Sequence, residues 1–220
     1  GLAVSNMRGN IASSAGSGDV SSTLFGVYGS YYGDKGHFAD VIVKYGRIGN
    51  KIGNTANSVH YEGSGSANGL NMSLEYGYHK ELANKWYIEP QVELNYGHIN
   101  ANDYTMSAGG AAGAKVQNEA VNSFIGRLGM NVGKTTKGGN IYAKLSVAKE
   151  FAGDVGVRTS FGDYSKYTKE SLSDTWFEYG VGFNQKLGKQ ANLYGEVSST
   201  AGANKLSEKW KFNIGMRYTF

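Results

Sequence analysis

The sequence predicts an all-β protein, an antiparallel up-and-down transmembrane β-barrel, and two observations lead to this fold class. Apolar and polar residues alternate with a period of two in one segment after another, and this period places successive side chains on opposite faces of a strand. The connectors between these segments are alternately long and short along the whole chain. Outer-membrane barrels have this arrangement, with short periplasmic turns and longer extracellular loops.

The composition fits this fold class and excludes several others. Gly accounts for 33 of the 220 residues, whereas Pro occurs once and Cys is absent, so the chain has no disulfide framework and no thiolate chemistry. No apolar run approaches the roughly 18 residues of a membrane helix. The 22 basic and 18 acidic residues are scattered along the chain, and we therefore expect no nucleic-acid partner. The four His residues lack metal-ligand spacing, and we expect no metal or other cofactor.

The N-terminal half contributes five predicted strands. The segment "LAVSNMR" at 2–8 alternates least regularly, and "TLFGVYGSYY" at 23–32 and "FADVIVKYG" at 38–46 are ambiguous. In "GLNMSLEYGYH" at 69–79, Leu, Met and Tyr share one face and Asn, Ser and Glu share the other. The clearest case is "WYIEPQVELNY" at 86–96, where the apolar and aromatic residues fall at alternate positions and the residues between them are polar, apart from one Tyr.

The C-terminal half contributes five more. The segments "SFIGRLGMNV" at 123–132, "NIYAKLSV" at 140–147 and "WFEYGVGFNQ" at 176–185 each have one largely apolar face. The short "ANLYGEV" at 191–197 follows the same rule, and "WKFNIGMRYTF" at 210–220 alternates without an error. Most of the ten segments are 8 to 11 residues long. A tilted strand of about 9 to 11 residues crosses the hydrocarbon core of a bilayer.

The nine connectors separate into two classes by length. The long ones are predicted to be extracellular loops at 10–22, 50–67, 100–121, 152–174 and 199–209. The short ones are predicted to be periplasmic turns at 33–36, 80–85, 135–139 and 186–190. A soluble β-sandwich has no reason to sort its loops by side in this way. The same order places Phe220 at the periplasmic end of the last strand.

The polar faces of the strands predict the lining of the barrel lumen. Glu75, Glu89 and Glu93 fall on two consecutive strands and form an acidic wall, and we expect Arg127 on the next strand to pair with one of them. One interpretation is that a water-filled lumen simply requires polar residues. The other is that this wall holds a polar segment inside the barrel. The whole predicted lining comprises Asp40, Lys44, Glu75, Glu89, Glu93, Arg127, Lys144, Glu178, Glu196, Lys211 and Arg217.

Aromatic residues lie near the ends of the predicted strands, where an outer-membrane barrel carries its aromatic girdles at the two membrane interfaces. The alternative is that aromatic residues are common in strands of any kind. The predicted girdle consists of Tyr78, Trp86, Tyr96, Trp210, Tyr218 and Phe220.

Three stretches of the sequence together resemble the translocator barrel of type V autotransporters. The first is "SLEYGYHKELANKWYIEPQVELNYGHI" at 73–99, the second is "GRLGMNVG" at 126–133, and the third is "DTWFEYGVGFNQKLGKQANLYGEVSSTAGANKLSEKWKFNIGMRYTF" at 174–220. As an ordered series, the resemblance extends from about residue 26 to the C-terminus. It implies an outer-membrane barrel that anchors an N-terminal passenger and helps to export it to the cell surface.

The resemblance also carries expectations about the extent of the chain and its activity. Barrels of this family have twelve strands and a helix that crosses the lumen and joins the passenger. Since ten strands are predicted here, we expect residues 1–220 to be a translocator barrel that lacks its first strands and its linker helix. We expect no enzyme in this chain, although a passenger can be enzymatic and some family members cut their own linker inside the barrel. The alternative function is an adhesin or porin-like barrel that acts through its extracellular loops.

The last strand resembles the outer-membrane assembly motif of the family, which Asn213, Gly215, Tyr218 and Phe220 match. The implied partner is the β-barrel assembly machinery, which binds such a strand through its edge. The other implied partners are outer-membrane lipid and lipopolysaccharide, the chain's own passenger and the linker helix. We expect the barrel to be a monomer in the bacterial outer membrane.

Overall fold

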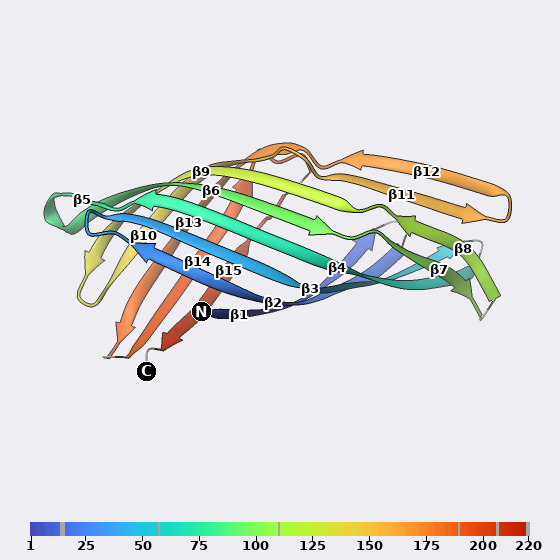
Figure 1. The fold of residues 1–220 in the computed structure, drawn as a ribbon, viewed down its shortest axis with the longest axis horizontal. Helices are drawn as coiled ribbons and strands as arrows, with labels where there is room; N and C mark the ends of the chain where they lie inside the picture. The colour runs from blue at the N-terminus through green and yellow to red at the C-terminus, as the bar shows by residue number, and fades with distance from the viewer. Residues whose placement is uncertain (14–15, 57, 110, 189, 206, 219–220) are drawn as a thin grey trace.

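The structure is a computed structural model that describes residues 1–13, 16–56, 58–109, 111–188, 190–205 and 207–218. Nearly all of these residues belong to one antiparallel sheet, which curls into a barrel wall (Figure 1). Ten long strands build this wall. They are β1 (Leu2–Ser13), β2 (Gly16–Tyr32), β3 (His37–Ala56), β4 (Val59–Tyr78), β6 (Trp86–Ile99), β9 (Val121–Thr136), β10 (Gly139–Glu150), β13 (Asp174–Leu187), β14 (Ala191–Ala201) and β15 (Lys211–Tyr218).

Each wall strand pairs with the next one along the chain, from β1 to β15. This up-and-down order confirms the predicted fold class, and each of the ten predicted segments lies on a different wall strand. Among the residues that the structure describes, no helix has the length and hydrophobicity of a membrane-spanning segment.

The prediction of loops for the long connectors is wrong at four of the five places. At 10–22 and 50–67 the strands β1, β2, β3 and β4 simply continue, paired as far as Ser13 with Gly16 and Ala56 with Val59. At 100–121 and 152–174 the chain forms two further hairpins, β7 (Asn102–Ala108) with β8 (Ala111–Asn118), and β11 (Asp154–Phe161) with β12 (Tyr164–Ser171). Strand β12 is exposed along its whole length, so the apolar alternation of the wall strands stops there although the backbone pairing continues.

The two extra hairpins extend the sheet beyond the ends of β6, β9, β10 and β13, at the right of Figure 1. Strand β7 pairs with β4, and β8 pairs with β11, so the extension is continuous with the wall. The Lys169 ammonium donates a hydrogen bond to Asp154 across β11 and β12, and this contact lowers the pKa of the Asp154 carboxyl below its usual value. The fifth long connector, at 202–210, has no strand among its described residues.

The short connectors at 33–36, 80–85 and 135–139 are tight turns, as predicted, and the one at 186–190 includes a residue outside the described ranges. At 33–36 and at 135–139 the turn includes a glycine with positive φ, Gly36 at 89° and Gly138 at 85°. At 80–85 the chain forms the two-residue strand β5 (Lys80–Glu81) and the 3₁₀ turn η1 (Ala83–Lys85). There Asn84 and Lys85 adopt positive φ in place of glycine, which Asn tolerates better than most residues.

Aromatic rings inside the barrel lie on glycines of the neighbouring strand. In each of the four strand pairs that are connected at the extracellular side, an inward aromatic residue stands directly opposite a glycine, and a Cβ atom on that glycine would overlap the ring. The many glycines and tyrosines of the sequence therefore serve in part to seat rings flat on the lumen wall. The four pairs are Phe38–Gly77, Tyr87–Gly133, Tyr142–Gly182 and Tyr194–Gly215.

Replacing Gly133 with valine should lower the free energy of unfolding by about 1–3 kcal/mol, because the new side chain forces the Tyr87 ring off its seat. The Tyr87 side chain is buried, so the ring has little free space to enter. The measurement is urea unfolding of the refolded barrel in detergent micelles. Gly97→Val is the matched control, since a Cβ atom there meets only the Ser123 side chain at an ordinary 3.6 Å. Equal losses in both variants would contradict the seating role of Gly133.

Candidate functional site in the barrel lumen

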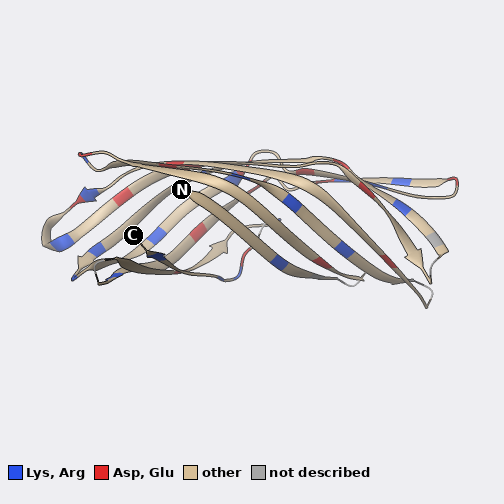
Figure 2. Cartoon of the chain, turned by 60° about the horizontal axis from the view of Figure 1, so that its bottom comes forward, with Lys and Arg blue, Asp and Glu red and all other residues tan. Residues whose placement is uncertain are grey.

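One row of charged residues crosses the lumen wall at mid-height. Asp40 on β3 stands opposite Glu75 on β4, Glu75 stands opposite Glu93 on β6, and Glu93 stands opposite Arg127 on β9. Residues that are paired in register on neighbouring strands share a face of the sheet. The row therefore places three carboxylates side by side with one guanidinium at their end. Figure 2 shows charged residues along the strands as well as at the turns.

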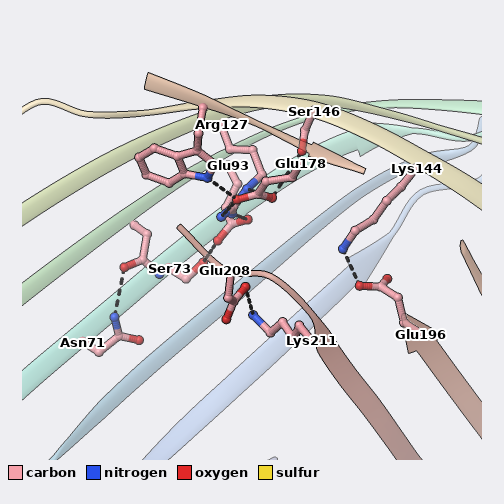
Figure 3. A network of polar contacts seen from close by, with 12 residues as sticks. Asn71, Ser73, Glu93, Arg127, Lys144, Ser146, Glu178, Glu196, Glu208 and Lys211 are labelled. Carbon is pink, nitrogen blue, oxygen red and sulfur yellow. Dashed lines mark hydrogen bonds and ion pairs between the residues drawn. The ribbon is translucent and has the colours of Figure 1, made fainter. Parts of the chain in front are cut away.

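Arg127 is the centre of an ion-pair network (Figure 3). Its Nη1 atom donates to the Glu93 carboxylate, and its Nε and Nη2 atoms donate to the two oxygens of Glu178, at 2.8 and 3.0 Å. The three side chains are only 23%, 18% and 17% exposed. The Ser73 hydroxyl donates to Glu93 at 3.0 Å, and the Trp176 Nε1 donates to Glu178 at 2.9 Å. Every oxygen of these two carboxylates is thus hydrogen-bonded.

The contact between Arg127 and Glu178 spans three strands, because Arg127 is on β9, Glu178 is on β13 and β10 lies between them. The inward residues of β10 at this height are Ala148, opposite Arg127, and Ser146, opposite Glu178. Both are small and buried, so the long arginine side chain can pass over β10. The Ser146 hydroxyl also donates to Glu178 at 3.3 Å.

A second ion pair lies closer to the periplasmic end. Lys144 on β10 pairs with Glu196 on β14, and the Tyr142 hydroxyl donates to the other Glu196 oxygen at 2.9 Å. Further round the wall, the Glu89 carboxylate lies 2.9 Å from the His79 Nδ1 and accepts a hydrogen bond from Asn131 at 3.1 Å. These contacts hold the side chains against the wall and leave the centre of the lumen open.

Two carboxylates of the row are not compensated. Among the described residues, neither Asp40 nor Glu75 has an ion-pair partner, and Glu75 has no hydrogen bond either. Asp40 accepts only the neutral Ser30 hydroxyl. Because Glu75 stands between Asp40 and Glu93, it faces like charge on both sides. This part of the lumen therefore has a local excess of negative charge.

Two cavities occupy the lumen. One, of about 340 Å³, lies beside the Arg127 network, and Glu208 and Lys211 also line it, from the connector before β15 and from β15 itself. The other, of about 500 Å³, lies toward the periplasmic end and is lined by His79, Tyr87 and Arg217 among others. Glu75 lines both cavities. The uncompensated carboxylate therefore faces the open space of the pore.

The predicted lumen residues lie on the wall strands at inward positions, but Arg127 has two ion-pair partners where the sequence predicted one. Arg127 pairs with Glu93 of the acidic wall, and it also pairs with Glu178, which was not foreseen. Trp176 was missed as well, although it is 5% exposed and hydrogen-bonded to Glu178. Its position two residues before Glu178 on the same face was the available indication.

The predicted girdle residues that the structure describes are on the outer face. Tyr78 ends β4, Trp86 begins β6 and Tyr218 ends β15, all at the end of the barrel with the short turns. Trp210 precedes β15 at the opposite end and is 66% exposed. Tyr96, on β6, is 36% exposed. Phe220 lies outside the described residues, whereas Asn213, Gly215 and Tyr218 of the predicted assembly motif are on β15.

Glu150 is a buried acidic residue that the sequence did not single out. It ends β10 at the extracellular side, is 2% exposed, and accepts hydrogen bonds from the Ser123 hydroxyl and from the Phe124 and Ala152 amides. It therefore joins the ends of neighbouring strands at the base of the β11–β12 hairpin. Within the described ranges, no group of three or more His, Cys, Asp or Glu is arranged to hold a metal ion.

Comparison with known proteins gives a consistent set of similarities. A family model described as the autotransporter beta-domain matches residues 1–198. The chain is similar to the BrkA autotransporter of Bordetella pertussis, with 33% identity over 93% of this chain and 20% of that protein. It is also similar to the probable autotransporter YcgV of Escherichia coli K12, with 30% identity over 100% of this chain and 23% of that protein. The chain spans about a fifth of the length of these relatives.

Solved structures show the same fold. The crystal structure of the BrkA beta domain from Bordetella covers 100% of this chain with a TM-score of 0.72 and 22% identity, and 88% of that domain is matched. The translocator domain of NalP from Neisseria meningitidis also gives a TM-score of 0.72, with 14% identity and coverage of 100% of this chain and 73% of that domain.

Proposed function

The chain belongs to the autotransporter β-domain family, and on this premise we propose that its acidic lumen wall holds a basic segment that links the barrel to its passenger. Autotransporter β domains are outer-membrane translocators of Gram-negative bacteria that carry a passenger, and this chain is one of them. This membership favours the translocator over the adhesin or porin-like barrel that the sequence left open.

The observation that supports a lumenal partner is the uncompensated pair of carboxylates, Asp40 and Glu75. A carboxylate that faces like charges in a confined space is stabilised by a cation within about 4–6 Å. Arg127 already donates hydrogen bonds to Glu93 and Glu178 through its Nε, Nη1 and Nη2 atoms, so it does not neutralise Glu75 as well. A lysine or arginine on a segment inside the pore would supply the missing charge, and the open cavities beside Glu75 leave space for it.

We assign no catalytic role to the lumen. Two of its carboxylates are already hydrogen-bonded within the wall. Glu178 accepts from Arg127, Trp176 and Ser146, and Glu196 accepts from Lys144 and Tyr142. One relative is named serine protease EspC, and this chain matches 16% of its length. We propose that any enzymatic activity of the longer protein lies in the passenger.

The outward partners are proposals of the same kind. The exposed apolar face would contact outer-membrane lipid and lipopolysaccharide, and the last strand, with its motif at Asn213, Gly215, Tyr218 and Phe220, would be bound by the β-barrel assembly machinery. A barrel whose outward face is covered by lipid needs no second copy, so we propose a monomer.

The experiment places a photo-reactive amino acid in the full-length protein, produced in cells. At Gln91, which lines the lumen cavity beside Glu75, the probe should cross-link to the segment upstream of the barrel. At Val92, which follows it and faces outward with 43% exposure, the probe should not. Mass spectrometry of the cross-linked peptide identifies the segment and shows whether it is basic.

Charge removal then tests the role of the acidic wall. The double variant Asp40→Asn, Glu75→Gln should reduce the yield of the Gln91 cross-link several-fold. Glu170→Gln, on the exposed hairpin strand β12, is the control and should leave it unchanged. An unchanged yield in the double variant, or a captured segment without basic residues, would contradict the proposed charge pairing and leave the family assignment intact.

A further inference from the structure

We propose that the outer face of the barrel binds one phospholipid of the periplasmic leaflet, with an acyl chain in a furrow across β9–β15 and its phosphate beside Lys134. The furrow has a volume of about 960 Å³, within the range of sites for small molecules. Residues that line it include Trp86, Val132, Ile141, Val181, Phe183 and Ile214. This proposal rests on the position of the barrel in the outer membrane and is independent of the lumen.

The shape of the furrow follows from side-chain size. Ala143 on β10 stands between Val132 on β9 and Val181 on β13, so the smallest side chain is in the middle of the row. Larger side chains stand at the two ends of the furrow, Trp86 at one and Phe212 with its neighbour Ile214 at the other. A convex barrel thus has a local hollow where a flexible chain can lie against the sheet.

The lining is apolar and open to the membrane. Val181 is 61% exposed and Ile214 is 79% exposed, and no ion pair among the described residues involves a lining side chain on the outer face. The cation at its edge is Lys134, whose Nζ atom lies 5.6 Å from the centre of the Trp86 ring. Tryptophan and lysine are the residues that anchor to the headgroup level of a bilayer. The pair therefore marks the polar end of the furrow.

The furrow lies in the periplasmic half of the wall. Trp86 is the first residue of β6, and Lys134 is two residues from the end of β9, both next to the short turns. In the sequence, residues 132–141 and 183–195 contain four lysines and no Asp or Glu, and the turn at 80–85 that leads into Trp86 adds Lys80 and Lys85 against the single acid Glu81. The four lysines of the two longer ranges are Lys134, Lys137, Lys186 and Lys189. This edge of the barrel is therefore suited to an anionic phosphate.

The positive charge of the turns favours a lipid over a second copy of the chain as the occupant of the furrow. Two barrels in one membrane have the same orientation, so a dimer across this face would bring the lysine-rich turns of both copies to the same level. Like charges without compensation oppose such a contact. A phospholipid offers the complementary combination, a long apolar chain joined to a single phosphate. The furrow and Lys134 fit both parts of this ligand at once.

The test is native mass spectrometry of the folded barrel in detergent, with phosphatidylglycerol and a diacylglycerol of the same chains as probes. We expect one retained phosphatidylglycerol per barrel and weaker binding of the diacylglycerol. Lys134→Gln should reduce phosphatidylglycerol binding roughly fivefold and leave diacylglycerol binding unchanged. Ala143→Phe, which fills the hollow, should reduce the binding of both probes.

Two controls keep the outcome specific. Lys137→Gln removes a lysine from the turn that follows β9, close to Lys134 but outside the furrow lining. Val92→Phe enlarges an outward side chain elsewhere on the wall. Both should bind as the unaltered barrel does, and the heat-modifiable mobility of every variant on a gel reports folding. Binding that is insensitive to Ala143→Phe and to Lys134→Gln would overturn the proposal. A dimer that Ala143→Phe dissociates would overturn it in favour of a second copy.

Discussion

Replacing Arg127 with methionine should lower the free energy of unfolding by about 3–5 kcal/mol, the cost of breaking a buried ion pair by removing one partner. Methionine keeps most of the length of the side chain and removes its charge and donors. Glu93 and Glu178 would then face each other across the same space without a cation, at less than one-fifth exposure each. The adjoining row of Asp40 and Glu75 adds like charge to this site.

The measurement is urea unfolding of the refolded barrel in micelles at neutral pH. Lys144→Met is the matched comparison, because it leaves a single carboxylate, Glu196, which keeps the Tyr142 hydroxyl as a donor. We expect a smaller loss there. Changing Glu93 and Glu178 to glutamine in the Arg127→Met background should restore much of the stability, since the two carboxylates that Arg127 neutralised are then uncharged. A loss in Arg127→Met no larger than in Lys144→Met would contradict the central role of Arg127.

The sequence predicted the wall strands because the two faces of each strand meet different surroundings. At 86–96 the outward residues Trp86, Val92 and Tyr96 are exposed on the apolar outer face, whereas Glu89 and Glu93 face the lumen. The contrast appears in the sequence as an alternation of apolar and polar residues. The contrast is weaker in the hairpins β7–β8 and β11–β12: all of β12 is exposed, and β7 and β8 carry few large apolar residues, so neither hairpin has the long alternation of a wall strand.

The candidate site was predicted only as a list of inward residues. Its pairing depends on strand register and on the length of each side chain, which alternation alone does not specify. Arg127 reaches Glu178 over two strand spacings because Ala148 between them is small, and no local pattern indicates that. The seating of Tyr87 on Gly133 depends likewise on register between residues 46 positions apart. The abundance of Gly and Tyr was visible, but the pairing of particular rings with particular glycines was not.

The outward assignment of Val92 leads to the second large effect. Val92 stands between Tyr76 on β4 and Leu128 on β9, near the middle of β6 and on the apolar face. Arginine at the midplane of a lipid-facing strand costs about 2–4 kcal/mol, because the charge must leave water for hydrocarbon. Val92→Arg should therefore lower the free energy of unfolding in phospholipid bilayers by this amount.

The neighbouring Gln91→Arg is the control that isolates the face from the position. Gln91 lines the lumen cavity together with Glu75 and Glu89, so an arginine there meets water and negative charge in place of lipid. We expect little loss or a gain in stability. Urea unfolding of both variants in vesicles of the same lipid gives the comparison. The two residues are adjacent on β6, so their backbone positions differ little. The difference in the free energy of unfolding between the two variants therefore reports which side of the wall each side chain occupies. Equal costs at Gln91 and Val92 would mean that β6 does not separate lumen from lipid at this height.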